Sequence, residues 1–138
     1  MRQIKFRAWD VDNKQFVFLV IIHHSAIPKI VPSYKGNFDE WQQFIDLKDR
    51  YGIEIYEGDI VEHKSRYLHV AGRFEVKYDT EKHGRAKGDF AAFCLHSVGE
   101  WDPRYKGDKG WGGVVGSQGH LVKELEIIGN IYENPELL

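Results

Sequence analysis

The chain has 138 residues, which suits a single domain of ordinary size, and 42% of them are hydrophobic. Its formal net charge of −2 excludes the strongly basic balance that is typical of a dedicated nucleic-acid binder. The single cysteine excludes an intramolecular disulfide, and the N-terminus lacks the apolar segment of a signal peptide, so we expect a cytoplasmic protein.

Strand-forming patterns begin at the N-terminus. Apolar and polar residues alternate over residues 4–9, which is the period of a strand with one buried face. A turn rich in Asp and Asn follows at residues 10–14, and a near-continuous apolar run at 16–22 predicts a second strand. This run is far shorter than the ~20 residues of a membrane-spanning helix. We therefore expect no membrane insertion and a β-hairpin that pairs residues 4–9 with 15–22.

A loop and a third strand follow this hairpin. Residues 23–39 contain two prolines and no clean hydrophobic period, which predicts a loop. The apolar positions of residues 41–47 suit either a short helix or a strand. We favour a strand, because Gly52 in the turn that follows is available for a positive φ angle.

Short strands separated by polar turns continue to residue 132. Ile53, Ile55, Ile60 and Val61 indicate extended segments around a bend, and alternation predicts a strand at 68–78. Further strands are expected at 90–98 and within 121–132, separated by a Gly- and Trp-rich loop at 99–119. The sequence Asn-Pro-Glu at 134–136 predicts one terminal helical turn capped by Asn134.

These patterns predict a mainly β protein in two parts. Residues 1–46 form an N-terminal β-ribbon and loop, which we expect to mediate oligomerisation. Residues 47–138 form a small β-barrel that carries the long 99–119 loop, with little helix anywhere.

Three segments resemble the YopX family of small phage and prophage proteins. They are MRQIKFRAWD at residues 1–10, LKDRYGIEIYEGDIV at 47–61 and IGNIYENPELL at 128–138. Their order and spread over nearly the whole chain make the resemblance specific, although no motif covers residues 64–123. The resemblance implies an SH3-like barrel, a phage or prophage origin and homo-oligomerisation. It implies no established activity, no cofactor and no catalytic residue.

The acidic step Glu57-Gly58-Asp59 is open to two interpretations. As a catalytic pair, the two carboxylates would need a cleft and a partner that separates their pKa values, and the sequence supplies neither. As structure, Gly58 permits a bend, Asp59 bonds nearby backbone and the following apolar pair enters the core. We favour the structural interpretation and expect both carboxylates to be exposed to solvent at the start of a strand.

No metal site or reactive thiol is predicted. Cys94 lies in an apolar strand, which indicates a buried inert thiol rather than a nucleophile. A zinc site built from His63, His69, Cys94 and His96 is conceivable, but the spacing matches no common structural zinc site.

Basic and aromatic residues gather in the middle of the chain, where they could bind nucleic acid or a protein partner. Small barrels bind single strands by stacking bases on aromatic rings and pairing phosphates with Lys or Arg. The candidates are Arg66, Arg73, Lys77, Arg85, Lys87, Trp101, Tyr105 and Trp111. The alternative is that the rings fill a core or an oligomer interface while the basic heads lie in water.

Two functional hypotheses follow from the sequence. The first is a phage- or prophage-encoded homo-oligomeric interaction module without biochemical activity, assembled through Phe16, Phe18 and Val20, whose further partner is an unidentified host or phage protein. The second is a nucleic-acid-binding β-barrel. Exposure of the loop aromatics would favour the second hypothesis, and their burial between chains would favour the first. An enzyme has no support in the sequence.

Overall fold

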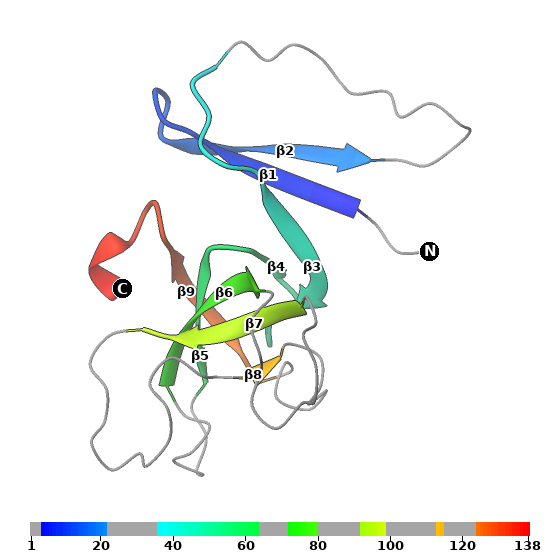
Figure 1. Ribbon diagram of the computed structural model, residues 1–138, viewed down its shortest axis with the longest axis vertical. Helices are drawn as coiled ribbons and strands as arrows, with labels where there is room; N and C mark the ends of the chain where they lie inside the picture. Colours follow the sequence, from blue (N-terminus) through cyan, green and yellow to red (C-terminus); the bar gives the residue numbers. More distant parts are fainter. Residues whose placement is uncertain (1–3, 22–35, 64–71, 80–91, 99–112, 115–123) are drawn as a thin grey trace.

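The computed structural model describes residues 4–21, 36–63, 72–79, 92–98, 113–114 and 124–138 (Figure 1). Over these residues, strands form two antiparallel sheets, and helical structure is limited to a 3-10 turn at Pro135–Leu137. The prediction of a mainly β fold is therefore confirmed. Among the same residues, no helix is both long and apolar enough to cross a lipid bilayer.

The first sheet has the order β2-β1-β3-β4. Its strands are β1 (Ile4–Asp10), β2 (Gln15–Ile21), β3 (Gln42–Lys48) and β4 (Glu54–Tyr56). The β1–β2 hairpin is confirmed, as is the choice of a strand over a helix at 41–47. In Figure 1 the hairpin lies at one end of the molecule, and β3 leads from it towards the other sheet.

The hairpin turn is closed by Asp10, as its Asx-rich sequence predicted. One carboxylate oxygen of Asp10 accepts the backbone N–H groups of Asp12 and Asn13, each at 3.1 Å, and the other accepts the Asn13 amide at 2.7 Å. These hydrogen bonds, led by the Asn13 side chain, lower the pKa of Asp10. The turn ends at Lys14, whose φ of 53° lies in the left-handed region.

The second sheet has the order β8-β7-β6-β5-β9. Its strands are β5 (Asp59–His63), β6 (Gly72–Asp79), β7 (Ala92–Ser97), β8 (Gly113–Val114) and β9 (Glu126–Asn130). An antiparallel sheet of this kind is compatible with the SH3-like detail, which stays an expectation.

Two predicted boundaries need comment. β8 lies inside the expected 99–119 loop, so the loop prediction is wrong at its two residues, which pair with β7. The rest of that loop lies outside the described residues. The proposed division between residues 46 and 47 falls within β3, and the two-part organisation stays a prediction.

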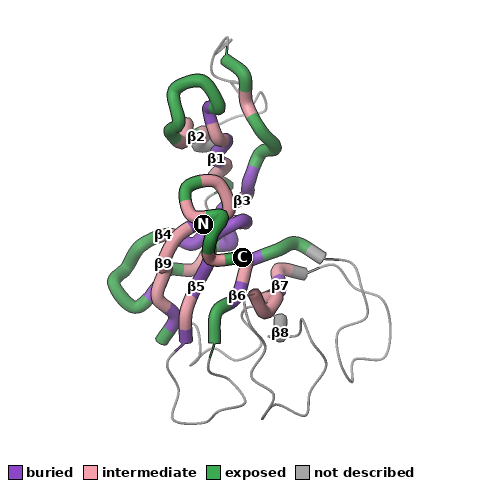
Figure 2. The backbone as a smooth tube through the Cα atoms, turned by 90° about the vertical axis from the view of Figure 1, so that its left-hand side faces the viewer, coloured by how far each residue is buried: buried purple, intermediate pink, exposed green. Residues whose placement is uncertain are grey.

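The core lies where the two sheets meet. Its buried residues are Ile45, Ile55, Val61, Phe74, Val76 and Leu125. They come from β3, β4, β5, β6 and the segment before β9, so both sheets contribute. Each such apolar side chain contributes about 1.5–3 kcal/mol when fully buried. Figure 2 shows this buried centre, with the tip of the β1–β2 hairpin exposed beyond it.

The C-terminal segment is shaped by Asn130 at the end of β9. Its side-chain oxygen accepts the backbone N–H groups of Tyr132, at 3.0 Å, and Glu133, at 2.9 Å. The single helical turn after Asn134 is confirmed, but Asn134 makes no side-chain capping bond to it. Instead, its side-chain oxygen lies 3.4 Å from the Asn130 backbone nitrogen. The chain reversal made by Asn130 therefore fixes where Tyr132 lies.

Candidate functional site

The turn between β4 and β5 joins three parts of the molecule through its backbone. The N–H of Glu57 donates to the carbonyl of Gln43 on β3 at 3.0 Å, and the N–H of Gly58 donates to Val76 on β6 at 2.8 Å. The carbonyl of Gly58 accepts the N–H of Ile131, just after β9, at 3.0 Å. The predicted bend at Gly58 is therefore the point at which both sheets and the C-terminal segment are bonded together.

Gly58 is required at this point for two reasons. Its φ of +76° lies in the left-handed region, which side-chain-bearing residues rarely adopt. A Cβ atom here would also lie 2.1 Å from the Gln42 side-chain nitrogen and 3.2 Å from the Ile131 methyl group. Any side chain at residue 58 would therefore displace Gln42.

The turn carries a buried ion pair at Asp59, which is only 2% exposed. One carboxylate oxygen accepts a hydrogen bond from the Arg7 guanidinium at 2.6 Å, and the other accepts the Tyr56 backbone N–H at 2.8 Å. Burial raises the pKa of Asp59, and the positive charge of Arg7 opposes that rise. The expectation of a solvent-exposed Asp59 was wrong, because the sequence did not show that β1 brings Arg7 over this turn.

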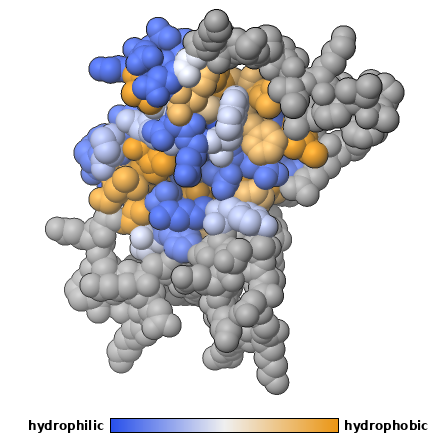
Figure 3. All heavy atoms as spheres, turned by 45° about the horizontal axis from the view of Figure 1, so that its top comes forward, coloured by the Kyte–Doolittle hydropathy of each residue, from blue (hydrophilic) through white to orange (hydrophobic). Residues whose placement is uncertain are grey.

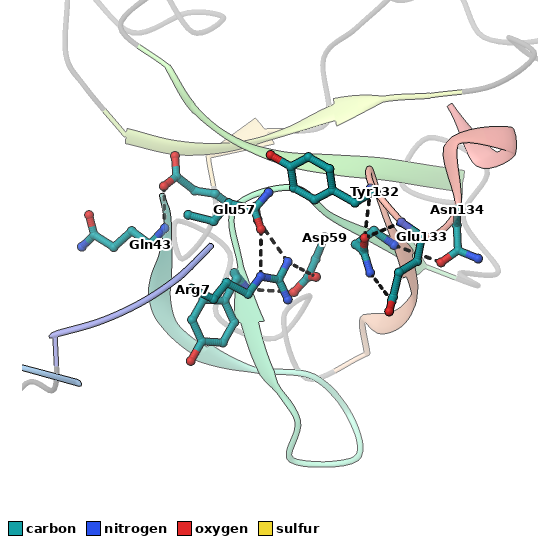
Figure 4. Close-up of polar contacts among 10 residues, drawn as sticks. Arg7, Gln43, Glu57, Asp59, Tyr132, Glu133 and Asn134 are labelled. Carbon is teal, nitrogen blue, oxygen red and sulfur yellow. Dashed lines mark hydrogen bonds and ion pairs between the residues drawn. The ribbon is translucent and has the colours of Figure 1, made fainter. Parts of the chain in front are cut away.

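Further polar contacts hold the Arg7 guanidinium in place beside Asp59 (Figure 4). It donates to the Gln42 side-chain oxygen at 2.8 Å and to the Glu57 carbonyl at 3.2 Å. Its guanidinium carbon lies 4.1 Å from the ring centre of Phe16 and 4.8 Å from that of Tyr56. We call this set of residues the ribbon junction: Arg7, Phe16, Gln42, Tyr56 and Asp59.

Aromatic rings extend the ribbon junction on its outer side. Tyr132 stacks on Trp9 with ring centres 5.6 Å apart and an interplanar angle of 1°. Phe16 meets both rings edge-on, at 5.0 Å from Trp9 and 6.1 Å from Tyr132. The C-terminal segment therefore packs directly against the β1–β2 hairpin.

The neighbouring acid, Glu57, also has a structural role. One oxygen of its carboxylate accepts the backbone N–H of Gln43 at 2.7 Å. Glu57 thus bonds β3 through its side chain while Asp59 bonds Arg7 and Tyr56. This geometry supports the structural interpretation of the acidic step, since both carboxylates hold other parts of the fold in place.

A known protein family matches nearly the whole chain. The YopX protein family model matches residues 5–138. The chain belongs to the YopX family. It is also similar to a solved structure, described as the crystal structure of protein EF1440 from Enterococcus faecalis. The two chains are 26% identical, with 98% of this chain and 97% of that chain covered and a TM-score of 0.46. No curated protein matches the sequence.

In this YopX-family chain, the predicted interface residues lie on β2, at the edge of the first sheet. Phe16 is half-buried in the ribbon junction, whereas Phe18 is 63% exposed. The Phe18 ring packs edge-to-face with Tyr56, with ring centres 6.0 Å apart, and is tilted against Phe16 at 6.5 Å. Val20 pairs with Lys5 in the β1–β2 register, and its side chain lies outside the description.

The predicted basic surface is only partly described. Arg73 and Lys77 are exposed on β6, and each lies near an acid: Arg73 is 3.8 Å from Glu62, and Lys77 is 3.2 Å from Glu75. The other candidates lie outside the described residues: Arg66, Arg85, Lys87, Trp101, Tyr105 and Trp111. Each of these two basic side chains therefore lies beside an acid, Glu62 on the neighbouring strand β5 for Arg73 and Glu75 on β6 itself for Lys77.

In the described part of the chain, no three His, Cys, Asp or Glu side chains converge as possible metal ligands. His63 is buried, and one ring nitrogen lies 2.8 Å from the Glu124 carboxylate. Cys94 on β7 is buried, as expected for a thiol in an apolar strand, and its expected inertness stays a prediction.

Sequence reasoning missed the central residue of the ribbon junction, Arg7. One signal could have found it. Arg7 and Asp59 both belong to the segments that carry the YopX resemblance, and charged residues of opposite sign in two such segments are candidates for a pair. Tyr132 lies in the third of these segments and was also missed, because its contact with Trp9 arises only from the folding of distant parts of the chain.

Proposed function

We propose that this YopX-family protein is an interaction module that assembles into a homo-oligomer through the edge of β2. The observation that carries the proposal is that β2 is an uncharged edge strand with an exposed aromatic side chain at its centre. β2 is seven residues long and ends the four-stranded sheet, so one side of its backbone is not paired within the described sheet. Such an edge is a template for pairing with another chain.

Natural edge strands usually carry features that prevent this pairing. Charged residues, prolines and bulges are the common ones. The β2 sequence, QFVFLVI, contains no charged residue and no proline, and its pairing with β1 is continuous from residue 15 to residue 21. At its centre, Phe18 exposes 63% of its surface. These features favour a second copy as the group that covers the edge.

A twofold axis through the edge would suit this strand. In an antiparallel pair of identical strands, both chains contribute the same residues, which is the arrangement of a closed symmetric dimer. Phe18 is the central residue of β2, so two copies of its ring would lie close together near such an axis. The ribbon junction fixes the hairpin to the second sheet, which keeps this edge in one orientation.

The remaining features of the proposal rest on the family and on the sequence. We propose a phage or prophage origin, action in the cytoplasm of the bacterial host and no catalytic activity. The YopX resemblance, the single cysteine and the structural use of Glu57 and Asp59 support these points. The module would present its remaining surfaces to a host or phage protein.

Light scattering coupled to gel filtration tests the assembly. The wild-type chain should elute as a discrete oligomer, and Phe18→Lys should lower its mass because two ammonium groups would meet at the axis. Tyr51→Lys is the matched control, since Tyr51 is 66% exposed on the turn before β4 and should not affect mass. Circular dichroism should show unchanged β structure in both variants. A wild-type monomer, or a Phe18→Lys oligomer of normal mass, would remove β2 as the interface.

A further inference from the structure

A cleft of about 200 Å³ lies beside the ribbon junction. It is bounded by the segment leading into β3, the turn between β4 and β5, strand β6 and the segment after β9. Backbone hydrogen bonds of Glu57 and Gly58 join this turn to β3, β6 and the segment after β9, so the walls of the cleft are held in fixed relation. The cleft does not include β2, and the following argument is independent of the proposed assembly.

Three aromatic rings line this cleft. Trp41 is 50% exposed and Tyr78 is 54% exposed, so both rings are accessible to a ligand. The third ring is Tyr132, which Trp9 supports from behind by parallel stacking. Tyr78 is braced edge-on by Phe93 at 5.2 Å. The cleft therefore offers supported aromatic faces to whatever enters it.

The charged residues of the cleft are mainly acidic. Glu40, Glu57 and Glu75 stand against one base, Lys77, which leaves a net charge of −2. Lys77 pairs with Glu75 at 3.2 Å, so these two largely offset each other. Among the described residues, neither Glu40 nor Glu57 takes part in an ion pair. Figure 4 shows Glu57 and Tyr132 on the same side of the turn.

The negative potential reaches the aromatic wall. The pKa of Tyr132 is raised first by burial and then by the negative charges of Asp39 and Glu40. A cation entering the cleft would therefore meet the carboxylates of Glu40 and Glu57 as well as electron-rich ring faces. Figure 3 shows hydrophilic and hydrophobic residues lying next to each other over the described surface.

We infer that this cleft binds an arginine side chain presented by a protein partner. A guanidinium group is planar, stacks on aromatic rings and donates in a fork that carboxylates accept. It is also less strongly hydrated than an ammonium group, so it loses less on entering a partly apolar cleft. The small volume fits one such side chain rather than a folded segment. Phosphate-bearing ligands are disfavoured, because the uncompensated charges here are negative.

The same chain already shows how it holds a guanidinium. In the ribbon junction, Arg7 lies over the rings of Phe16 and Tyr56 and donates to the Asp59 carboxylate. The cleft repeats these elements at the surface, with Trp41 and Tyr132 as rings and Glu57 as a carboxylate. The difference is that no arginine of the described residues fills it.

The test uses three blocked tripeptides added to the full chain and followed by NMR. The first has the order Gly-Arg-Gly, the second replaces arginine by its neutral isostere citrulline, and the third replaces it by lysine. The arginine peptide should bind with a Kd on the order of 1 mM and shift the Trp41 indole N–H signal together with the backbone amide signals of Gly58 and Tyr132, which remain as reporters when Trp41 is replaced. The citrulline peptide should produce no shift, and the lysine peptide should bind about threefold more weakly.

Two variants connect this binding to the cleft. Glu40→Gln should weaken the arginine peptide about threefold, and Trp41→Ala should weaken it about fivefold. Glu136→Gln and Tyr51→Ala remove an exposed acid and an exposed ring elsewhere and should change nothing. Both cleft residues are at the surface, so their variants should keep the wild-type spectrum outside the cleft.

Several outcomes would overturn the inference. Equal binding of the arginine and citrulline peptides would show that charge is not recognised. Arginine binding that Glu40→Gln and Trp41→Ala leave unchanged would move the site elsewhere. Absence of any shift at tens of millimolar peptide, or displacement of the peptide by a single-stranded oligonucleotide at the same signals, would also reject it. Because a monomeric chain retains the cleft, failure of the assembly proposal would leave this test intact.

Discussion

Arg7 on β1 and Asp59 at the start of β5 are 52 residues apart, and their side chains meet at 2.6 Å in the interior of the protein. This pair connects the β1–β2 hairpin to the second sheet. Since both side chains are almost fully buried, neither charge is compensated by water. The pair is therefore a buried contact that helps to set the orientation of the hairpin, together with the β1–β3 pairing and the packing of Trp9 on Tyr132.

Removal of one partner should destabilise the fold strongly. Asp59→Asn leaves the Arg7 charge without its counterion, and we expect the free energy of unfolding to fall by about 3 kcal/mol or more. Lys5→Met is the control, because its ion pair with Glu54 is partly exposed and should contribute at most about 1 kcal/mol. Urea denaturation followed by circular dichroism measures both. Equal losses in the two variants would contradict a special role for the buried pair.

Removal of the other partner should give a defect that depends on pH. In Arg7→Met, nothing opposes the effect of burial, so the pKa of Asp59 should rise further above its ordinary value of 3.8. Between pH 3.8 and this raised pKa, the folded state still binds a proton that the unfolded state has released. The stability of Arg7→Met therefore falls as pH rises through this interval. The loss in free energy of unfolding caused by Arg7→Met, relative to the wild type, should therefore become smaller towards acid pH. The loss caused by Asp59→Asn should not become smaller. Parallel urea titrations from pH 7 downwards would show whether the two defects diverge.

Two glycines with similar backbone angles should respond differently to alanine. Gly52 has a φ of +82° and open space around it, so Gly52→Ala should cost only the left-handed strain of about 1–2 kcal/mol. Gly58→Ala adds a collision with Gln42, which disturbs the hydrogen bond to Arg7, and should cost roughly 3 kcal/mol or more. Thermal unfolding compares the two variants. Similar shifts in Tm would mean that Gln42 can move without cost.

Tyr56 should make the protein sensitive to alkali. Burial, together with the hydrogen bond to Glu54, raises the pKa of Tyr56 to about 12. The unfolded state releases the phenol proton near pH 10, before the folded state does, so stability should fall between about pH 10 and 12. In Tyr56→Phe this loss should be smaller, with Tyr132 contributing a remaining loss of the same sign. Urea midpoints of the wild type and Tyr56→Phe, measured between about pH 10 and 12, test this prediction. An equally steep fall of the midpoint with pH in both proteins would refute it.

The basic residues of β6 should not support nucleic-acid binding by themselves. Because Arg73 and Lys77 lie beside Glu62 and Glu75, we expect no salt-sensitive shift of a labelled single-stranded oligonucleotide in a gel assay. A shift at low salt that disappears in the charge-reversed variant Arg85→Glu/Lys87→Glu would instead establish the nucleic-acid hypothesis. That variant should leave the oligomeric state unchanged.

The fold was largely accessible from the sequence because strand periodicity is a local signal. The hairpin, β3 and the strands around residues 60, 76 and 95 all follow from alternation and turn residues. The two-residue strand β8 was missed, because two residues in a glycine-rich segment carry no periodicity.

The candidate site was less accessible, because its chemistry comes from residues far apart in the chain. The acidic step was recognised as structural, but its burial depends on Arg7, whose position on a strand gives no sign of what it will meet. The cleft likewise combines four segments, and only their packing brings Trp41, Tyr78 and Tyr132 together. Pairings across such distances are set by tertiary structure and not by local pattern.

The pairing of β5 with β9 has a consequence for synthesis on the ribosome. β9 (Glu126–Asn130) pairs with β5 (Asp59–His63), which lies much earlier in the chain, and Asp49 bonds the backbone of Ile127. During synthesis, β5 therefore lacks one of its partner strands until β9 has emerged. The β1–β2 hairpin needs only its own residues and can form much earlier, so its uncharged edge is presented to neighbouring nascent chains before the second sheet is complete. The assembly that we propose through β2 would then begin during translation, ahead of complete folding.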